Sequence, residues 1–258
     1  MSTVSAHHAS STLLDPPKPT SLTTLVGVEL RKLLDTRAVL ATVVVAALLA
    51  GATGGGQTLR GDSTTFGDVT QMALLFAPYF LVALGATLVA GEYNHRTALT
   101  TFALVPRRGR ILAAKAGAIV TLSLVVAVLG LVAGVLISAV AGWAGLTSVS
   151  WSIDVPRFVV LVAGIVIAAL IGWAIGMATG STVIALAAYL VWPMVSTMIG
   201  SFSDEAARVL AWLRPDAVFS LAEGITATTA GQTATSLVLW ILLPAVLGWG
   251  RLTKGEVR

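Results

Sequence analysis

Residues 116–142 read AGAIVTLSLVVAVLGLVAGVLISAVAG, a run of 27 residues without a charged side chain. A helix needs about 20 predominantly apolar residues to cross the hydrocarbon core of a bilayer, at about 1.5 Å of rise per residue. This stretch is therefore long enough to span a membrane. The whole chain has the same character, because 56% of its 258 residues are apolar and only 11% are charged. These features predict an all-α integral membrane protein.

The charged residues divide the remainder of the chain. Residues 158–203 form an uncharged run that is too long for one helix and about right for two, so we divide it near Gly180, a natural hinge residue. Including the quoted stretch, about six spans result: residues 38–56, 71–91, 116–142, 158–179, 181–202 and 233–250. The other expected parts are a disordered tail at 1–20, a helix at 21–37 ahead of the transmembrane domain 38–250, an inner loop at 92–115 within it, and a tail at 251–258.

Basic residues set the orientation, because cytoplasmic loops carry an excess of lysine and arginine. With the N-terminus inside, only four of the 16 basic residues face outward: Arg60, Arg157, Arg208 and Arg214. Both termini are therefore expected in the cytoplasm, and the protein in the plasma membrane. Two spans within residues 116–156 would instead place the basic C-terminal tail outside, against the rule. The net charge of +4 is thus a topology signal and not a nucleic-acid surface.

Residue types that carry catalysis or ion coupling are missing from the predicted spans. None has Asp, Glu, Lys, Arg or His in its interior, whereas such residues inside a membrane usually mark proton relays, ion sites or catalytic groups. The chain has no cysteine and no Gly-x-x-x-x-Gly-Lys-Ser/Thr loop that would hold ATP phosphates. We therefore expect no catalytic, cofactor or metal site in this chain. Any uphill transport needs energy from another protein.

Residues 21–37 predict an amphipathic helix ahead of the first span. Its basic residues fall on the face opposite the apolar one, so the helix is expected to lie flat in the inner membrane interface with its charges toward lipid headgroups. A role in docking a partner is compatible with this position. The apolar face comprises Leu22, Leu25, Val26, Leu30, Leu33 and Leu34.

The inner loop, residues 92–115, is predicted to contain a short helix. Residues 98–105 place Leu99 and Phe102 at helical spacing, and the proline and glycine of residues 106–110 form a turn into the third span. A short helix held between two spans acts as a lever, because force applied to it tilts both spans. On charge alone, the five basic residues of this loop are explained by the positive-inside rule.

Motifs in this loop distinguish the two interpretations. They are Gly-Glu-Tyr at residues 91–93, Thr97, Pro-Arg-Arg-Gly-Arg at 106–110 and Ala-Ala-Lys at 113–115. In these motifs the chain resembles the permeases of type-2 ATP-binding-cassette (ABC) exporters, especially the actinobacterial ones. The Val-Glu-Leu-Arg-Lys-Leu start at residues 28–33 is similar to that family as well. One departure is Arg96, where these permeases usually have glycine.

The resemblance implies a permease half that packs beside a second permease chain, identical or paralogous. It also implies a separate cytosolic ATPase that binds ATP and Mg and seats the short inner helix in a cleft. Glu92 is our first choice for the residue that fastens this helix, because the loop glutamate has that role in the family. The residues expected to couple the loop to the ATPase are Glu92, Tyr93, Arg96, Thr97, Leu99, Phe102, Arg107 and Arg108.

The outer segment before the last span, residues 202–232, is apolar on both sides of Pro215. We expect two short re-entrant helices that cover the outer mouth, with a plain surface loop as the alternative. Because no charge lies in the path, the expected cargo is hydrophobic or amphipathic: a drug-like natural product, a lipid or a glycolipid. The candidate substrate path comprises Tyr79, Tyr189, Trp192, Ser196 and Thr197.

Three functions remain open at this point. The first is the permease of an ABC exporter, whose efflux of drug-like compounds would confer antibiotic resistance. The second is a non-transporting membrane scaffold or anchor that recruits a cytosolic partner through the same loop. The third, an intramembrane enzyme, requires polar residues supplied by a partner chain. A co-purifying ATPase distinguishes the first from the second.

Overall fold

The computed structural model describes residues 21–94 and 108–254, which are almost entirely helical. Six segments of this part are long and apolar enough to cross a membrane, which confirms the predicted all-α integral membrane fold. The helices are α1 (Leu22–Leu34), α2 (Arg37–Thr58), α3 (Phe66–Ala73), α4 (Ala77–Asn94), α6 (Arg108–Trp143), α7 (Val155–Thr179), α8 (Thr182–Gly200), α9 (Asp204–Leu210), the 3-10 turns η1 (Ala211–Leu213) and η2 (Ala217–Ala222), α10 (Ala227–Leu237), the π-helical turn η3 (Val238–Leu242) and α11 (Leu243–Lys254).

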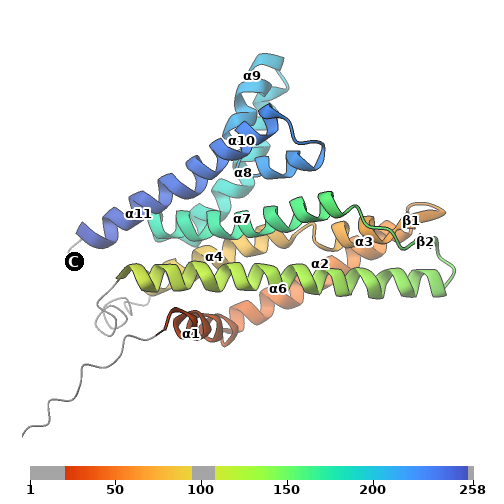
Figure 1. Cartoon of the computed structure of the whole chain (residues 1–258), viewed down its shortest axis with the longest axis horizontal. Helices are drawn as coiled ribbons and strands as arrows, with labels where there is room; N and C mark the ends of the chain where they lie inside the picture. Colours follow the sequence, from red (N-terminus) through yellow and green to blue (C-terminus); the bar gives the residue numbers. More distant parts are fainter. Residues whose placement is uncertain (1–20, 95–107, 255–258) are drawn as a thin grey trace, which may run out of the picture.

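Three of the long helices, α4, α6 and α7, run side by side along the molecule (Figure 1). The amphipathic helix α1 lies against the first half of α6, close to where α4 ends. The C-terminal end of α11 lies at this same end of the molecule (Figure 1). The first and last described helices therefore share one end, as an even number of spans requires.

Several helices begin before the predicted spans. α6 begins at Arg108, eight residues before the predicted start at 116, because arginine, alanine and lysine are good helix formers and a helix need not end where charges begin. The last span begins at Ala227 instead of about 233, where Thr226 and Thr229 form a reciprocal capping box. Charge-free runs therefore locate the spans but underestimate the length of the helices.

A short parallel pair of strands, which the sequence analysis does not predict, lies at the end of the molecule opposite α1 (Figure 1). β1 (Ser63–Thr65) pairs with β2 (Ser148–Ser150), with Ser63 opposite Ser148. Beside the pair, the ring of Trp151 stacks on that of Phe66, with centroids 5.9 Å apart. These contacts join the connection that follows α2 to the connection that follows α6.

Glycines bring α4 and α7 into backbone contact at the centre of the molecule. A Cβ on Gly172 of α7 would lie under 3.0 Å from the backbone of Val82, and a Cβ on Gly85 of α4 would be equally close to the carbonyl of Ala169. Small residues of this kind let membrane helices approach closely, which strengthens their van der Waals contacts. α4 and α7 therefore form one packed unit.

Candidate functional site

The inner loop that is predicted to couple to an ATPase joins α4 to α6. Glu92 and Tyr93 lie in the last turn of α4, and Arg108 is the first residue of α6. Their side chains lie outside the described part of the structure. The roles of the predicted coupling residues, and the short helix at 98–105, stay predictions. The coupling residues that lie wholly outside the described residues are Arg96, Thr97, Leu99, Phe102 and Arg107.

A buried ion pair lies close to the ends of α4 and α6 that this loop joins. The ammonium nitrogen of Lys115 is 2.7 Å from Oε2 of Glu29 and donates a second hydrogen bond of 3.0 Å to the carbonyl of Leu88. The side chains are 1% and 9% exposed for Lys115 and Glu29, so the pair is shielded from solvent. Three helices, α1, α4 and α6, meet at this one ammonium group.

This pair corrects the sequence analysis, which places Lys115 in the inner loop and gives Glu29 no partner. Lys115 and Arg110 both lie near the start of α6, ahead of the predicted span 116–142, so this part of the predicted inner loop is helical. A signal was available in the spacing, because Glu29 lies four residues before Leu33 and both are buried on one face of α1. A carboxylate at an apolar-face position indicates a buried cation, since a lone buried charge is costly.

The outer segment folds back beside the spans. α8 runs obliquely to α7 and α9 continues away from α7, whereas η2, later in the outer segment, packs against α7 (Figure 1). Phe219 of η2 occupies the space over Gly164. Gly164 lies nine residues after Val155, or roughly 14 Å along the helix. The expected short helices, α9 and η2, flank Pro215; their depth in a bilayer stays a prediction.

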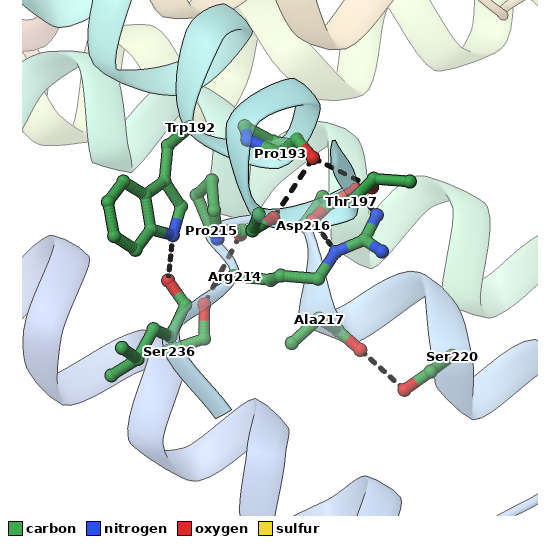
Figure 2. Close-up of polar contacts among 11 residues, drawn as sticks. Trp192, Pro193, Thr197, Arg214, Pro215, Asp216, Ala217, Ser220 and Ser236 are labelled. Atoms are coloured by element: carbon green, nitrogen blue, oxygen red, sulfur yellow. Dashed lines mark hydrogen bonds and ion pairs between the residues drawn. The ribbon is translucent and has the colours of Figure 1, made fainter. Parts of the chain in front are cut away.

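The irregular backbone between these short helices is held by side-chain donors from α8 and the last span. The indole N–H groups of Trp192 and Trp240 both donate to the carbonyl of Leu213, at 2.8 and 3.0 Å. The hydroxyl of Ser236 donates to the carbonyl of Pro215 at 3.2 Å (Figure 2). If the outer segment is re-entrant as predicted, these bonds would replace the hydrogen bonds to water that the membrane interior lacks.

An ion pair between Arg214 and Asp216 lies on either side of Pro215 in the same segment. Arg214 donates from Nε and Nη2 to the two carboxylate oxygens of Asp216, at 2.9 and 2.7 Å (Figure 2). The hydrogen bond with Asp216 raises the pKa of Arg214, so its guanidinium keeps its charge at any physiological pH. Bidentate geometry makes this a strong, direction-specific contact.

A cavity of about 340 Å³ opens next to this pair, between the end of α8 and the outer segment. Most of its wall is apolar, and Arg214 supplies its charged group. The hydroxyls of Ser196 and Thr197 both donate to the carbonyl of Pro193, at 2.9 and 2.8 Å (Figure 2). Their oxygens can therefore only accept hydrogen bonds from a substrate. The cavity is lined by Ser196, Thr197, Gly200, Ser201, Ala207, Leu210, Ala211 and Arg214.

The five residues of the predicted substrate path make different kinds of contact in the described structure. Ser196 and Thr197 line the outer cavity. Tyr79 and Tyr189 pack edge to face between α4 and α8, with ring centroids 5.8 Å apart. Trp192 holds the outer segment through Leu213, which is a structural role. Contact of any of these side chains with a substrate stays a prediction.

A known protein family matches most of the chain. The family described as ABC-2 family transporter protein matches residues 25–202, more than two thirds of the chain, from α1 to the end of α8. A search of curated proteins finds no match. Members of this family are normally the non-catalytic membrane subunits of transporters that work with an ATP-binding cassette partner. The chain belongs to the ABC-2 transporter family, as a multi-pass permease of the plasma membrane.

Proposed function

We propose that this chain is the permease subunit of an exporter that moves a hydrophobic or amphipathic substrate out of the cell. Drug-like compounds, lipids and glycolipids belong to this substrate class. A separate cytosolic ATPase binds ATP and Mg and supplies the energy, and a second permease chain, identical or paralogous, completes the pathway. The permease itself carries no catalytic residue. Efflux of antibiotics is one consequence of such an activity.

The outer cavity is the observation that carries this proposal. Its volume of about 340 Å³ falls in the range of small-molecule sites. Its mostly apolar wall suits the body of an amphipathic molecule, and the N–H groups of Arg214 suit a polar end. A bare anion is a poorer fit, because Asp216 already neutralises the guanidinium.

Contacts between α4 and α8 offer a mechanical route from the inner loop to this cavity. Tyr79 of α4 packs against Tyr189 of α8. Closer to the inner loop, the hydroxyls of Thr87 and Thr182 are 3.2 Å apart across the same interface. α4 leads directly into the loop and packs against α8, and α8 forms one wall of the cavity. A displacement of the loop is therefore passed through α4 to that wall.

Purification of the chain with its partners from its own cells tests the proposal. A stoichiometric ATPase is expected, and it is lost on Glu92→Ala or on deletion of residues 97–105. Glu223→Ala, which removes an exposed carboxylate from the outer segment, is the matched control and keeps the ATPase. Proteoliposomes of the complex should then move a fluorescent phospholipid or an amphipathic dye only when ATP is supplied.

Two outcomes would contradict parts of this proposal. A stable complex without any ATPase supports a membrane scaffold and refutes the exporter. An ATPase that remains bound in the loop deletion refutes the coupling role of the loop.

For antibiotic efflux, cells that lack the chain should become more sensitive to at least one amphipathic antibiotic. Unchanged sensitivity across a panel of such compounds would remove that part of the proposal.

A further inference from the structure

One ammonium group joins three helices just inside the inner loop. Lys115 lies seven residues after Arg108, where α6 begins, and Leu88 lies six residues before Asn94, where α4 ends. At about 1.5 Å per residue, their contact is roughly 10 Å from either end of the loop. Glu29 brings α1 to the same level. The two arms of the loop are thus tied to each other and to the amphipathic helix.

We propose that Lys115 is a positioning residue of the coupling machinery. Through the Glu29 carboxylate and the Leu88 carbonyl, it makes α1, α4 and α6 move as one unit when the loop is displaced. The inference rests on the proposed function, because it takes the loop between α4 and α6 as the point where an ATPase acts. It adds the atoms that pass the motion on to the spans.

Apolar contacts already fill this part of the core. Leu33 of α1, Leu88 of α4 and Ile119 of α6 belong to one buried cluster. A buried ion pair adds little stability compared with apolar residues of the same volume, because desolvation offsets the attraction. What the pair adds is a fixed orientation of the three helices relative to one another. Hydrogen bonds of 2.7 and 3.0 Å fix the rotation and height of the three helices relative to one another.

The unit formed in this way extends beyond three helices. Only Asp35 and Thr36 separate α1 from α2, and the Thr36 hydroxyl donates to the carbonyl of Leu33 at 2.9 Å. The first span therefore follows α1 closely. On the other side, α4 is in backbone contact with α7 at Gly172. A displacement of the loop thus reaches α2, α4, α6 and α7 together.

The sequence contains no cysteine, so two spin labels can be introduced without a background signal. Cysteines at Thr24 on α1 and Ala113 on α6, both exposed, report the distance between these helices by electron paramagnetic resonance. The distance is measured in the purified chain and in its complex with the co-purifying ATPase. Thermal unfolding and ATPase activity are measured on the same samples.

Three variants distinguish the effect of the ion pair on helix orientation from the effect of apolar packing. Glu29→Leu combined with Lys115→Met removes the pair but keeps most of the volume. Glu29→Lys combined with Lys115→Glu restores an ion pair between α1 and α6 but leaves the Leu88 carbonyl without the ammonium donor. Arg31→Leu, which removes an exposed charge from the same helix, is the matched control.

The wild type and Arg31→Leu should each give one narrow distance distribution, unchanged when ATP and vanadate are added to the complex. The apolar double variant should keep its thermal midpoint but broaden the distribution. Its complex should lose ATPase activity by about two- to thirtyfold, the range that mutations in coupling networks commonly show. The swapped variant should narrow the distribution again without regaining ATPase activity, because the contact with Leu88 is still missing.

A narrow distribution and full ATPase activity in the apolar double variant would overturn the proposal, since packing alone would then hold the helices. A fall in thermal midpoint that accounts for the whole loss of activity would also overturn it. If that variant does not fold, the swapped variant decides, and wild-type ATPase activity there counts against the role of Leu88. If no ATPase co-purifies, the proposed function fails, while the distance in the chain alone still tests the tie between α1 and α6.

Discussion

A methyl group at Gly172 tests the backbone contact between α4 and α7. In Gly172→Ala, the new Cβ would lie under 3.0 Å from the Cα, C and O atoms of Val82, which no change of rotamer can move aside. The two helices must separate by roughly 1 Å to restore normal contact, and a gap of this size forfeits a quarter to a half of each dispersion contact. Overpacked cores of this kind lose about 1–3 kcal/mol.

Thermal unfolding of the detergent-solubilised chain, followed by tryptophan fluorescence, measures this loss. At roughly 2–4 °C per kcal/mol for a chain of this size, the midpoint of Gly172→Ala should fall by about 2–12 °C. Gly51→Ala is the matched control, because nothing lies within 4 Å of its added Cβ. Alanine favours a helix over glycine by about 0.8–1.0 kcal/mol, so its midpoint should not fall. A midpoint for Gly172→Ala at or above that of the control would refute the contact.

The same thermal assay tests two groups of polar contacts. Trp192→Phe and Trp240→Phe each leave the Leu213 carbonyl one indole donor, whereas the double variant leaves it none and should lower the free energy of unfolding by about 1–3 kcal/mol beyond the sum of the single effects. Strictly additive effects would contradict a shared acceptor. Glu29→Leu alone removes the carboxylate that faces the buried Lys115 ammonium and should destabilise the fold by about 3–5 kcal/mol, most of which Lys115→Met should restore. A single variant as stable as the double would show that the pair is not buried.

Uncharged runs are enough to predict six spans, because a bilayer imposes a minimum apolar length on every helix that crosses it. They do not locate the ends of helices. α6 begins at Arg108 because basic residues and alanine continue a helix as well as leucine does. Lys115 therefore lies inside a helix, and its buried partner Glu29 is 86 positions away in the chain. Only the spacing of Glu29 and Leu33 on α1 pointed to such a partner.

The outer site is less accessible to sequence reasoning. Ser196 and Thr197 are recognisable as polar residues of an apolar helix, and both line the cavity. Arg214 is not recognisable as a wall of that cavity, because its position depends on how the outer segment folds back. That fold depends on long-range contacts such as Phe219 over Gly164 and the indole donors to Leu213, which no local pattern encodes.

Accessibility of the inner loop tests the central claim, that the segment between α4 and α6 faces the cytosol and receives work from an ATPase. Because the chain has no cysteine, Arg107→Cys places a single thiol in this segment. Gly61→Cys places one in the exposed turn before β1, at the other end of the molecule. A membrane-impermeant maleimide applied to intact cells should label Gly61→Cys and should reach Arg107→Cys only after permeabilisation. Labelling of Arg107→Cys in intact cells would contradict the account.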